Sequence, residues 1–192
     1  FGWFGFNAGG TIAAADIAAI VFTNTGVAAA SGMIVWLILH SMHAKRASFL
    51  EAIIGAVAGL ATVTPASGYV TPLSALTIGA LGALVCFFCV EFERKMWDDA
   101  LDVWGVHGMG GLLGILLIGI FADPRVNGVS AGISQFLIQA LGALIIGVYS
   151  ILVTFIIFKV VDMTKSIKVS EEIQRKGLDQ AFFKENYETK HE

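Results

Sequence analysis

The chain has 192 residues, 56% of them hydrophobic without its 22 glycines and only 14% charged, whereas soluble domains are about 45–50% apolar with glycine included and about 25% charged. This composition excludes a soluble globular protein, and the net charge of −3 leaves no basic surplus for binding nucleic acid. Residues 159–192 carry 14 of the 27 charged side chains. Long apolar runs separated by short charged clusters are typical of a polytopic membrane protein.

The chain begins with an apolar and aromatic segment, FGWFGFNAGG, at residues 1–10. The segment lacks the basic start and the small-residue cleavage site of a signal peptide. Ten helical residues reach only about 15 Å, which is half of the hydrocarbon core. We expect this segment to be the end of a transmembrane helix whose beginning lies in a preceding part of a longer protein.

Five further apolar segments are long enough to cross, or nearly cross, about 30 Å of hydrocarbon. Helices are expected because open strands leave backbone groups without partners in lipid. The predicted fold is therefore all-α, with a membrane domain at residues 1–158 and a tail at 159–192. The five predicted spans are 12–39, 47–63, 73–90, 103–122 and 129–158.

The connections between these spans differ in charge from one side to the other. Eleven Lys and Arg residues fall on the side that carries the tail, and one falls on the opposite side. This bias predicts a multi-pass protein of the cell membrane with a cytoplasmic C-terminus.

The last span, at 30 residues, would be about 45 Å long and must tilt or protrude. Motifs such as Gly55-xxx-Gly59 are expected to let helices approach closely.

His107 is the ionisable residue of greatest interest, because it lies about one turn inside the fourth complete span, in DVWGVHGMGG. Gly110, Gly111 and Gly114 are expected on its face of the helix, so this face is predicted to be bare backbone beside one imidazole. A neutral imidazole has one donor and one acceptor and can strip or relay a proton in a narrow lumen. The alternative is a histidine that hydrogen-bonds a carbonyl group of a neighbouring helix.

Other polar residues in the membrane domain have structural interpretations. Asp102 is expected to cap the helix that carries His107. Asp16 and Thr23 share a face, with Asn24 nearby, and either line a path or form interhelical hydrogen bonds. Glu51 is expected to be stabilised by its helix N-terminus and by nearby basic residues.

No motif in the sequence indicates an enzyme, a metal site or a cofactor. His40 and His43 are spaced like a metal pair, but a solvated basic cluster at the membrane surface is the better interpretation. Cys86 and Cys89 lie in an apolar helix, where redox chemistry would lack water. HExxH and phosphate-binding loops are absent from the sequence.

Trp3 and Phe6 in the first segment have two interpretations. They belong either to an interfacial aromatic belt or to a pore mouth, where an aromatic face attracts cations.

The combination of GWFGFNAG, TPASGYV and DVWGVHGMGGLLG followed by GIFA resembles the ammonium transporter family (Amt/Mep/Rh), from the sixth helix to the eleventh. The resemblance implies eleven helices in two inverted repeats, a homotrimer, and an outer vestibule that takes ammonium or methylammonium. The ion then loses its proton, and ammonia crosses a lumen lined by two histidines. By resemblance, Phe6 is the second gate phenylalanine and His107 is the second pore histidine. Asp102 resembles an aspartate that the family has at the start of the helix that carries this histidine.

Two positions depart from the family pattern. The family usually reads NAGS where this chain has Asn7-Ala8-Gly9-Gly10, so the vestibule hydroxyl is absent at Gly10 and Thr11 is its candidate replacement. The family tail meets PII-type signalling proteins, and here it diverges after Gly177-Leu178-Asp179. Within the tail, Ser170 is expected to cap a short helix that Gly177 ends.

Three functions therefore follow from the sequence. Ammonium transport is the leading hypothesis. An ammonium sensor that signals through its tail is the first alternative, because fold does not determine function. A structural fragment without activity is the third.

Overall fold

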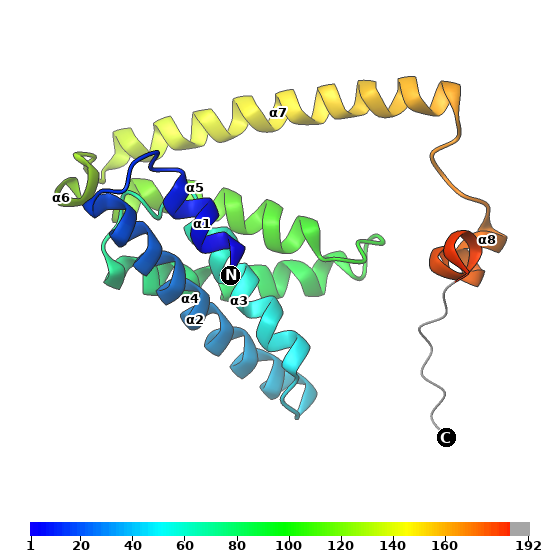
Figure 1. Ribbon diagram of the computed structural model, residues 1–192, viewed down its shortest axis with the longest axis horizontal. Coiled ribbons are helices and arrows are strands. Elements are labelled where there is room, and N and C mark those ends of the chain that lie inside the picture. The colour runs from blue at the N-terminus through cyan, green and yellow to red at the C-terminus, as the bar shows by residue number, and fades with distance from the viewer. Residues whose placement is uncertain (185–192) are drawn as a thin grey trace. The chain divides into compact units, whose positions relative to one another are not determined.

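A computed structural model describes residues 1–184, and every regular element in that range is a helix. The chain divides into two compact units, Phe1–Leu144 and Ile145–Glu192. The helices, as labelled in Figure 1, are α1 (Gly2–Gly9), α2 (Asp16–Ala44), α3 (Phe49–Val63), α4 (Pro72–Glu93), η1 (Val103–Gly108), α5 (Met109–Phe121), α6 (Pro124–Asn127), α7 (Ile133–Thr164), α8 (Glu171–Lys176) and η2 (Asp179–Phe183).

Four of these helical stretches are long and apolar enough to cross a membrane: α2, α4, the continuous η1–α5 stretch and α7. The all-α prediction is confirmed. α3 corresponds to the predicted span 47–63 but has 15 residues, or about 22 Å of helix, which is shorter than the hydrocarbon core. The connection of residues 64–71 follows α3 directly.

Local capping explains where several helices begin. The Ser48 side chain accepts a hydrogen bond from the Glu51 N–H at the start of α3, and Thr71 accepts one from Ser74 before α4. Pro72 occupies the first turn of α4, where a missing N–H costs nothing. α2 begins at Asp16 rather than near residue 12, because residues 11–15 form turns.

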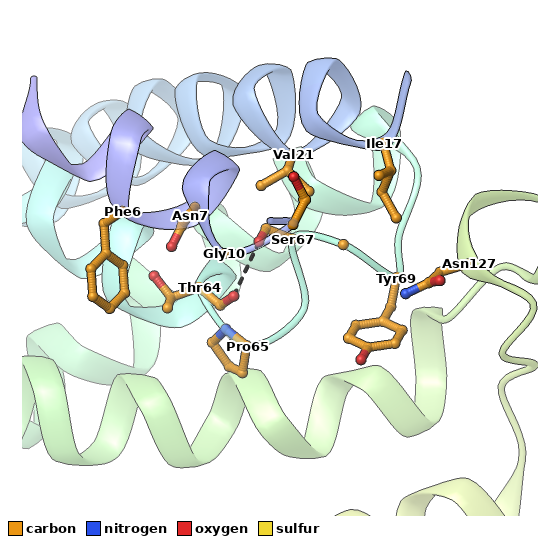
Figure 2. A pocket seen from close by; sticks show the side chains of 12 residues that line it. Phe6, Asn7, Gly10, Ile17, Val21, Thr64, Pro65, Ser67, Tyr69 and Asn127 are labelled. Atoms are coloured by element: carbon orange, nitrogen blue, oxygen red, sulfur yellow. Dashed lines mark hydrogen bonds between the residues drawn. The ribbon is translucent and has the colours of Figure 1, made fainter. Parts of the chain in front are cut away.

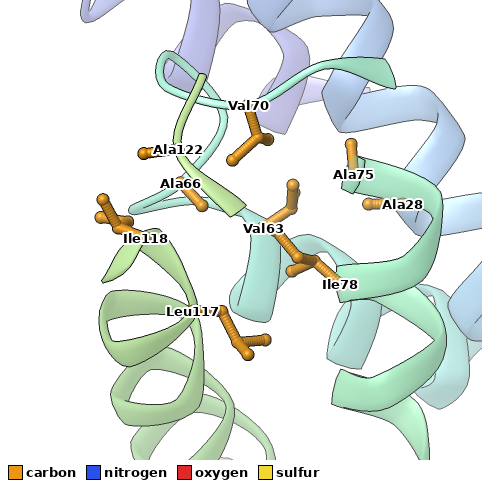
Figure 3. Packing of buried hydrophobic residues seen from close by; sticks show 9 residues of the cluster. All are labelled: Ala28, Val63, Ala66, Val70, Ala75, Ile78, Leu117, Ile118 and Ala122. Carbon is orange, nitrogen blue, oxygen red and sulfur yellow. The ribbon is translucent and has the colours of Figure 1, made fainter. Parts of the chain in front are cut away.

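Small residues bring α2, α3 and α4 into close contact. A Cβ at Gly59 would overlap the carbonyl oxygen of Ala28 on α2, and one at Gly82 would overlap the Thr62 side chain on α3. The expected packing role of Gly55 and Gly59 is confirmed. Figure 3 shows the resulting core, with side chains from α2, α3, α4, α5 and the connections after α3 and α5: Ala28, Val63, Ala66, Val70, Ala75, Ile78, Leu117, Ile118 and Ala122.

The first residues of α7 belong to the first unit and join α5. The Gly132 N–H donates to the Gly119 carbonyl over 2.9 Å. A Cβ at Gly119 would lie 2.5 Å from the Cα of Phe136, so the helices approach closely here. None of the 32 residues of α7 is buried within the described residues.

The tail contains the short helix that the sequence predicts. Ser170 accepts a hydrogen bond from the Ile173 N–H over 3.4 Å, and α8 ends at Lys176, followed by Gly177 with a φ of 89°. Glycine is the residue that adopts this backbone conformation at least cost.

Candidate functional site

A cavity of about 690 Å³ opens in the first unit, where the end of α1, the first turns of α2, the connection after α3 and one residue of α6 meet (Figure 2). All of its described lining residues are uncharged. They are Phe6, Asn7, Gly10, Thr11, Ile17, Val21, Thr64, Pro65, Ser67, Gly68, Tyr69 and Asn127.

The side chains of Asn7 and Asn24 connect the elements that line this cavity. The Asn7 amide donates to the Thr25 hydroxyl over 3.0 Å and ties α1 to α2. The Asn24 amide donates to the carbonyl groups of Ser67 and Val70, over 2.8 and 2.7 Å, and fixes the connection after α3. Both asparagines are buried. Of the two interpretations of Asn24, the structure favours structural hydrogen bonding, with the connection after α3 as partner and not a helix, whereas Thr23 bonds its own helix at Ala19.

Gly10 and Thr11 both line the cavity. The Thr11 hydroxyl donates to the Ala8 carbonyl over 2.7 Å and lies 3.0 Å from the Ala13 carbonyl. Because a hydroxyl has one proton and two lone pairs, Thr11 can offer only an acceptor to a molecule in the cavity. An acceptor is what an ammonium ion requires.

Trp3 connects this cavity to His107. Its indole stacks on the His107 imidazole, with 5.9 Å between ring centroids and 8° between planes, and meets Phe6 edge-on at 6.5 Å. The indole N–H donates to the Thr64 hydroxyl over 2.8 Å. The three rings of Phe6, Trp3 and His107 therefore form one contiguous row that begins at the cavity wall.

The stacking of Trp3 on His107 is a contact that sequence reasoning missed. Trp3 and Phe6 are three residues apart, so they share a face of α1. This spacing places Trp3 one turn from Phe6 on the same face of α1. It is the feature of the sequence from which a contact of Trp3 near Phe6 could have been predicted. The partner of that face, residues 103–108, is distant in sequence and could be identified only from the fold.

His107 lies on η1, a π-helical turn that precedes α5. Single π-helical turns occur frequently at functional sites. The turn begins at Asp102, which has a φ of 52°, and the Asp99 carboxylate accepts the Trp104 N–H over 2.8 Å. This hydrogen bond lowers the pKa of Asp99 below its ordinary value.

The expected capping role of Asp102 is wrong. Asp102 occupies the N-cap position, but its side chain makes no cap hydrogen bond. Its carboxylate instead accepts two bonds from the Arg94 guanidinium, Nη2 to Oδ2 at 2.8 Å and Nε to Oδ1 at 3.3 Å. The capping bond belongs to Asp99, and Asp102 anchors the start of η1 to the end of α4.

The glycines near His107 do not form one face that is free of contacts with other helices. A Cβ at Gly110 would lie 3.0 Å from the Thr62 hydroxyl, and one at Gly114 would overlap the Thr62 carbonyl. Gly111 has no described neighbour within 4 Å. The predicted face of bare backbone is therefore wrong for Gly110 and Gly114, which pack on α3.

Glu51 and His40 lie in local contact with each other, whereas the buried Glu93 carboxyl group has no hydrogen-bond partner among the described residues. Glu51 accepts the Trp36 indole N–H over 2.7 Å and lies 3.7 Å from His40 Nδ1. The His40 side chain is 17% exposed, so a fully solvated cluster is wrong for His40, whereas His43 is exposed. Within residues 1–184 no group of three possible metal ligands occurs.

Comparison with known proteins assigns this chain to a family. The Ammonium Transporter Family model matches residues 1–187. Ammonium transporter Amt1 of Archaeoglobus fulgidus is 41% identical over 186 residues, which cover 93% of this chain and 47% of that protein. The chain thus spans about half the length of the curated relatives it matches.

Solved structures agree in fold as well as in sequence. Candida albicans Mep2 superposes with a TM-score of 0.82 and 31% identity, over 89% of this chain and 41% of that one. A structure described as a sensor Amt protein superposes with a TM-score of 0.84 and 32% identity, over 94% of this chain and 46% of that one. With its apolar spans, the chain is a multi-pass membrane protein and belongs to the ammonium transporter family.

Proposed function

We propose that the protein containing this chain conducts ammonium or ammonia across the cell membrane, along a path from the cavity past Phe6 and Trp3 to His107. The observation that carries this proposal is the unbroken row of three rings between the cavity and the histidine. The relatives are named ammonium transporters, which supports the same substrate, here ammonium or methylammonium.

The cavity is suited to a small cation that must give up its water. Phe6 is 70% exposed, and an aromatic face attracts a cation by about 0.5–2 kcal/mol. Thr11 supplies an acceptor in place of the hydroxyl that Gly10 lacks. Because the described lining is uncharged, a cation is held weakly, and weak binding favours onward passage.

His107 is placed to exchange a proton rather than to bind an ion tightly. The parallel stacking on Trp3 covers one face of the imidazole and leaves its two ring nitrogens at the edge. One nitrogen of a neutral imidazole accepts and the other donates. Away from bulk water an ammonium ion loses its hydration shell and is less stable, so its proton passes to the accepting ring nitrogen of His107 and ammonia continues.

The proposal also covers the assembly and the orientation of the protein. The Lys and Arg bias puts the tail in the cytoplasm, and the family resemblance supports a homotrimer. A PII-type protein is the proposed partner of the tail, through the segment Gly177–Asp179 that follows α8. Residues 185–192, the rest of the divergent tail, lie outside the described residues.

An ammonium sensor is the second candidate function. The solved sensor Amt protein, at a TM-score of 0.84, favours it specifically. A sensor binds ammonium at the cavity and changes its tail without net flux, so transport measurements separate the two functions.

Growth on scarce ammonium tests the proposal. The complete protein is expected to restore growth of cells that lack their own ammonium transporters, and His107→Ala is expected to change the ammonium concentration that supports half-maximal growth. His43→Ala, an exposed histidine outside the path, is the control and should behave as wild type. Equal membrane levels with no restored growth would favour the sensor, and wild-type growth of His107→Ala would remove His107 from the path.

A further inference from the structure

Glu93, the last residue of α4, is a buried carboxylic acid that the proposed conduction path does not use. The residue is fully buried, and neither carboxyl oxygen has a hydrogen-bond partner among the described residues. The thiol groups of Cys86 and Cys89 interact with it from the same helix but bring no positive charge. An ionised carboxylate without a compensating partner is unstable in such surroundings.

Glu93 lies directly against the π-helical turn η1. A Cβ at Gly105 of η1 would lie 3.0 Å from Glu93 Oε2 and 2.7 Å from Val90 Cγ2, so the turn packs closely on α4 here. The Cys86 thiol donates to the Val106 carbonyl of η1 over 3.7 Å. Cys86, Val90 and Glu93 are spaced i, i+4 and i+7 and share one face of α4. All three are buried, so this face of α4 supports η1.

The charged groups that act on the Glu93 side chain from the loop before η1 are acidic. Asp102 lies within hydrogen-bonding reach of it, and Asp99 would repel a negative charge on it. Arg94 is already bonded to both oxygens of Asp102, over 2.8 and 3.3 Å. Two ionised carboxylates have acceptors but no donor, so Glu93 and Asp102 can bond only when one carries a proton. Arg94 stabilises the ionised form of Asp102, which leaves the proton on Glu93.

We propose that Glu93 is a positioning residue for His107, present as a neutral carboxylic acid that donates its proton in a hydrogen bond to the Asp102 carboxylate. Together with the Arg94 pair, this bond joins the end of α4 to the start of η1. His107 follows Gly105 by two residues, so a shift of η1 on α4 moves the imidazole relative to the indole stacked on it. The effect on His107 rests on the proposed function, whereas the proton on Glu93 does not.

A bound monovalent cation is the other means of stabilising a buried carboxylate. An ion between Glu93 and Asp102 would need several oxygen ligands and would meet the guanidinium of Arg94, which already occupies both oxygens of Asp102. A proton needs no additional space beside Gly105. The packing and the local charge therefore favour the proton.

Infrared spectroscopy of the complete protein in liposomes tests the proton directly, because a neutral carboxylic acid and an ionised carboxylate absorb at different wavenumbers. At pH 7 the wild type is expected to show a carboxylic acid band that is lost in Glu93→Gln. Glu91→Gln is the matched control, since Glu91 lies on the same helix but is 45% exposed. It should leave the band unchanged.

Three substitutions of Glu93 measure its effect on methylammonium uptake by proteoliposomes. Glutamine has the shape of the neutral acid and an N–H donor for Asp102, so Glu93→Gln should transport at nearly the wild-type rate. Glu93→Asp withdraws the acid by one methylene, and Glu93→Leu removes the hydrogen bond. Both are expected to lower the maximal rate about fivefold. The half-saturating concentration should stay unchanged, because the cavity that receives the ion is not altered.

Four results would overturn the proposal. They are the absence of a Glu93-dependent acid band, a band that appears only after monovalent cations are removed, a loss of uptake in Glu93→Gln as large as in Glu93→Leu, and wild-type uptake by Glu93→Leu. Circular dichroism shows whether each variant is folded. If Glu93→Leu does not fold, Glu93→Asp and Glu93→Gln give the same comparison. If the wild type transports nothing, the proposed function fails, and the infrared result still decides whether Glu93 carries the proton.

Discussion

The hydroxyl of Thr64 holds the Trp3 indole beside His107. Thr64 accepts the indole N–H over 2.8 Å and donates its own proton to the Leu60 carbonyl over 2.7 Å. This chain of two hydrogen bonds fixes the indole to the end of α3. The position of the ring that covers His107 therefore depends on one hydroxyl from a different helix.

Replacing the Thr64 hydroxyl should disturb the position of Trp3 in the proposed path. Thr64→Val leaves the partly buried indole N–H without an acceptor, which costs about 1–3 kcal/mol, and releases Trp3 from His107. We expect methylammonium uptake by proteoliposomes to fall several-fold in Thr64→Val. Thr64→Ser keeps the hydroxyl and should transport at nearly the wild-type rate. Equal uptake by the two variants would show that this hydrogen bond does not position Trp3.

Asp123 provides a pH-dependent contact beside the cavity. Arg125 donates to its carboxylate through Nε and Nη2, and this side-chain hydrogen bond, with the Arg125 N–H, lowers the pKa of Asp123 from 3.8 to about 2. Because the folded-state pKa is depressed, the stabilisation is complete above about pH 3.8 and is lost as the pH falls through about 2. The segment affected contains α6 and the cavity residue Asn127.

Amide hydrogen exchange checks this pH dependence. Between pH 4 and 5, residues 123–128 should exchange more slowly in the wild type than in Asp123→Asn at the same pH. The difference should fall to about half near pH 2, where half of the Asp123 carboxylates are protonated, and should vanish at lower pH. A difference that stays constant down to pH 2 would contradict the assignment.

At the scale of elements, glycines decide how closely the helices approach. A Cβ at Gly59 would overlap the Ala28 carbonyl, whereas Gly111 has open space around it. Gly59→Ala is expected to lower stability by about 1–3 kcal/mol through overpacking. Gly111→Ala is expected to be neutral or stabilising by up to about 1 kcal/mol, because alanine is the better helix former. Thermal unfolding in detergent compares them, and equal melting temperatures would refute the packing role of Gly59.

The helices were predictable because hydrophobic length, proline and capping residues act locally, as at Ser48, Pro72 and Ser170. Phe6, Gly10 and Thr11 line one cavity, a grouping that their closeness in sequence makes predictable, while their roles as gate and vestibule stay predictions. The Arg94 pairing with Asp102, the π-helical turn and the Trp3 stacking on His107 were not predictable. Each depends on side chains from different elements, and a positive φ at Asp102 contradicts its local preference.

At the scale of the whole molecule, the chain provides one set of packed helices and, in the proposed function, one side of a conduction path. Its apolar α7 has no buried residue within the described part, and Phe6 and His107 are exposed. The chain spans about half the length of its relatives. We therefore expect the opposite wall of the path to come from the rest of a full-length protein.

Currents from the complete protein in liposomes on a solid-supported membrane test the central claim most directly. An ammonium concentration jump is predicted to give a transient current or an internal pH change in the wild type and in His43→Ala. His107→Ala and Phe6→Ala should alter its size, its concentration dependence or its selectivity over potassium. Currents from His107→Ala and Phe6→Ala identical to wild type in all three respects would contradict a path through Phe6, Trp3 and His107.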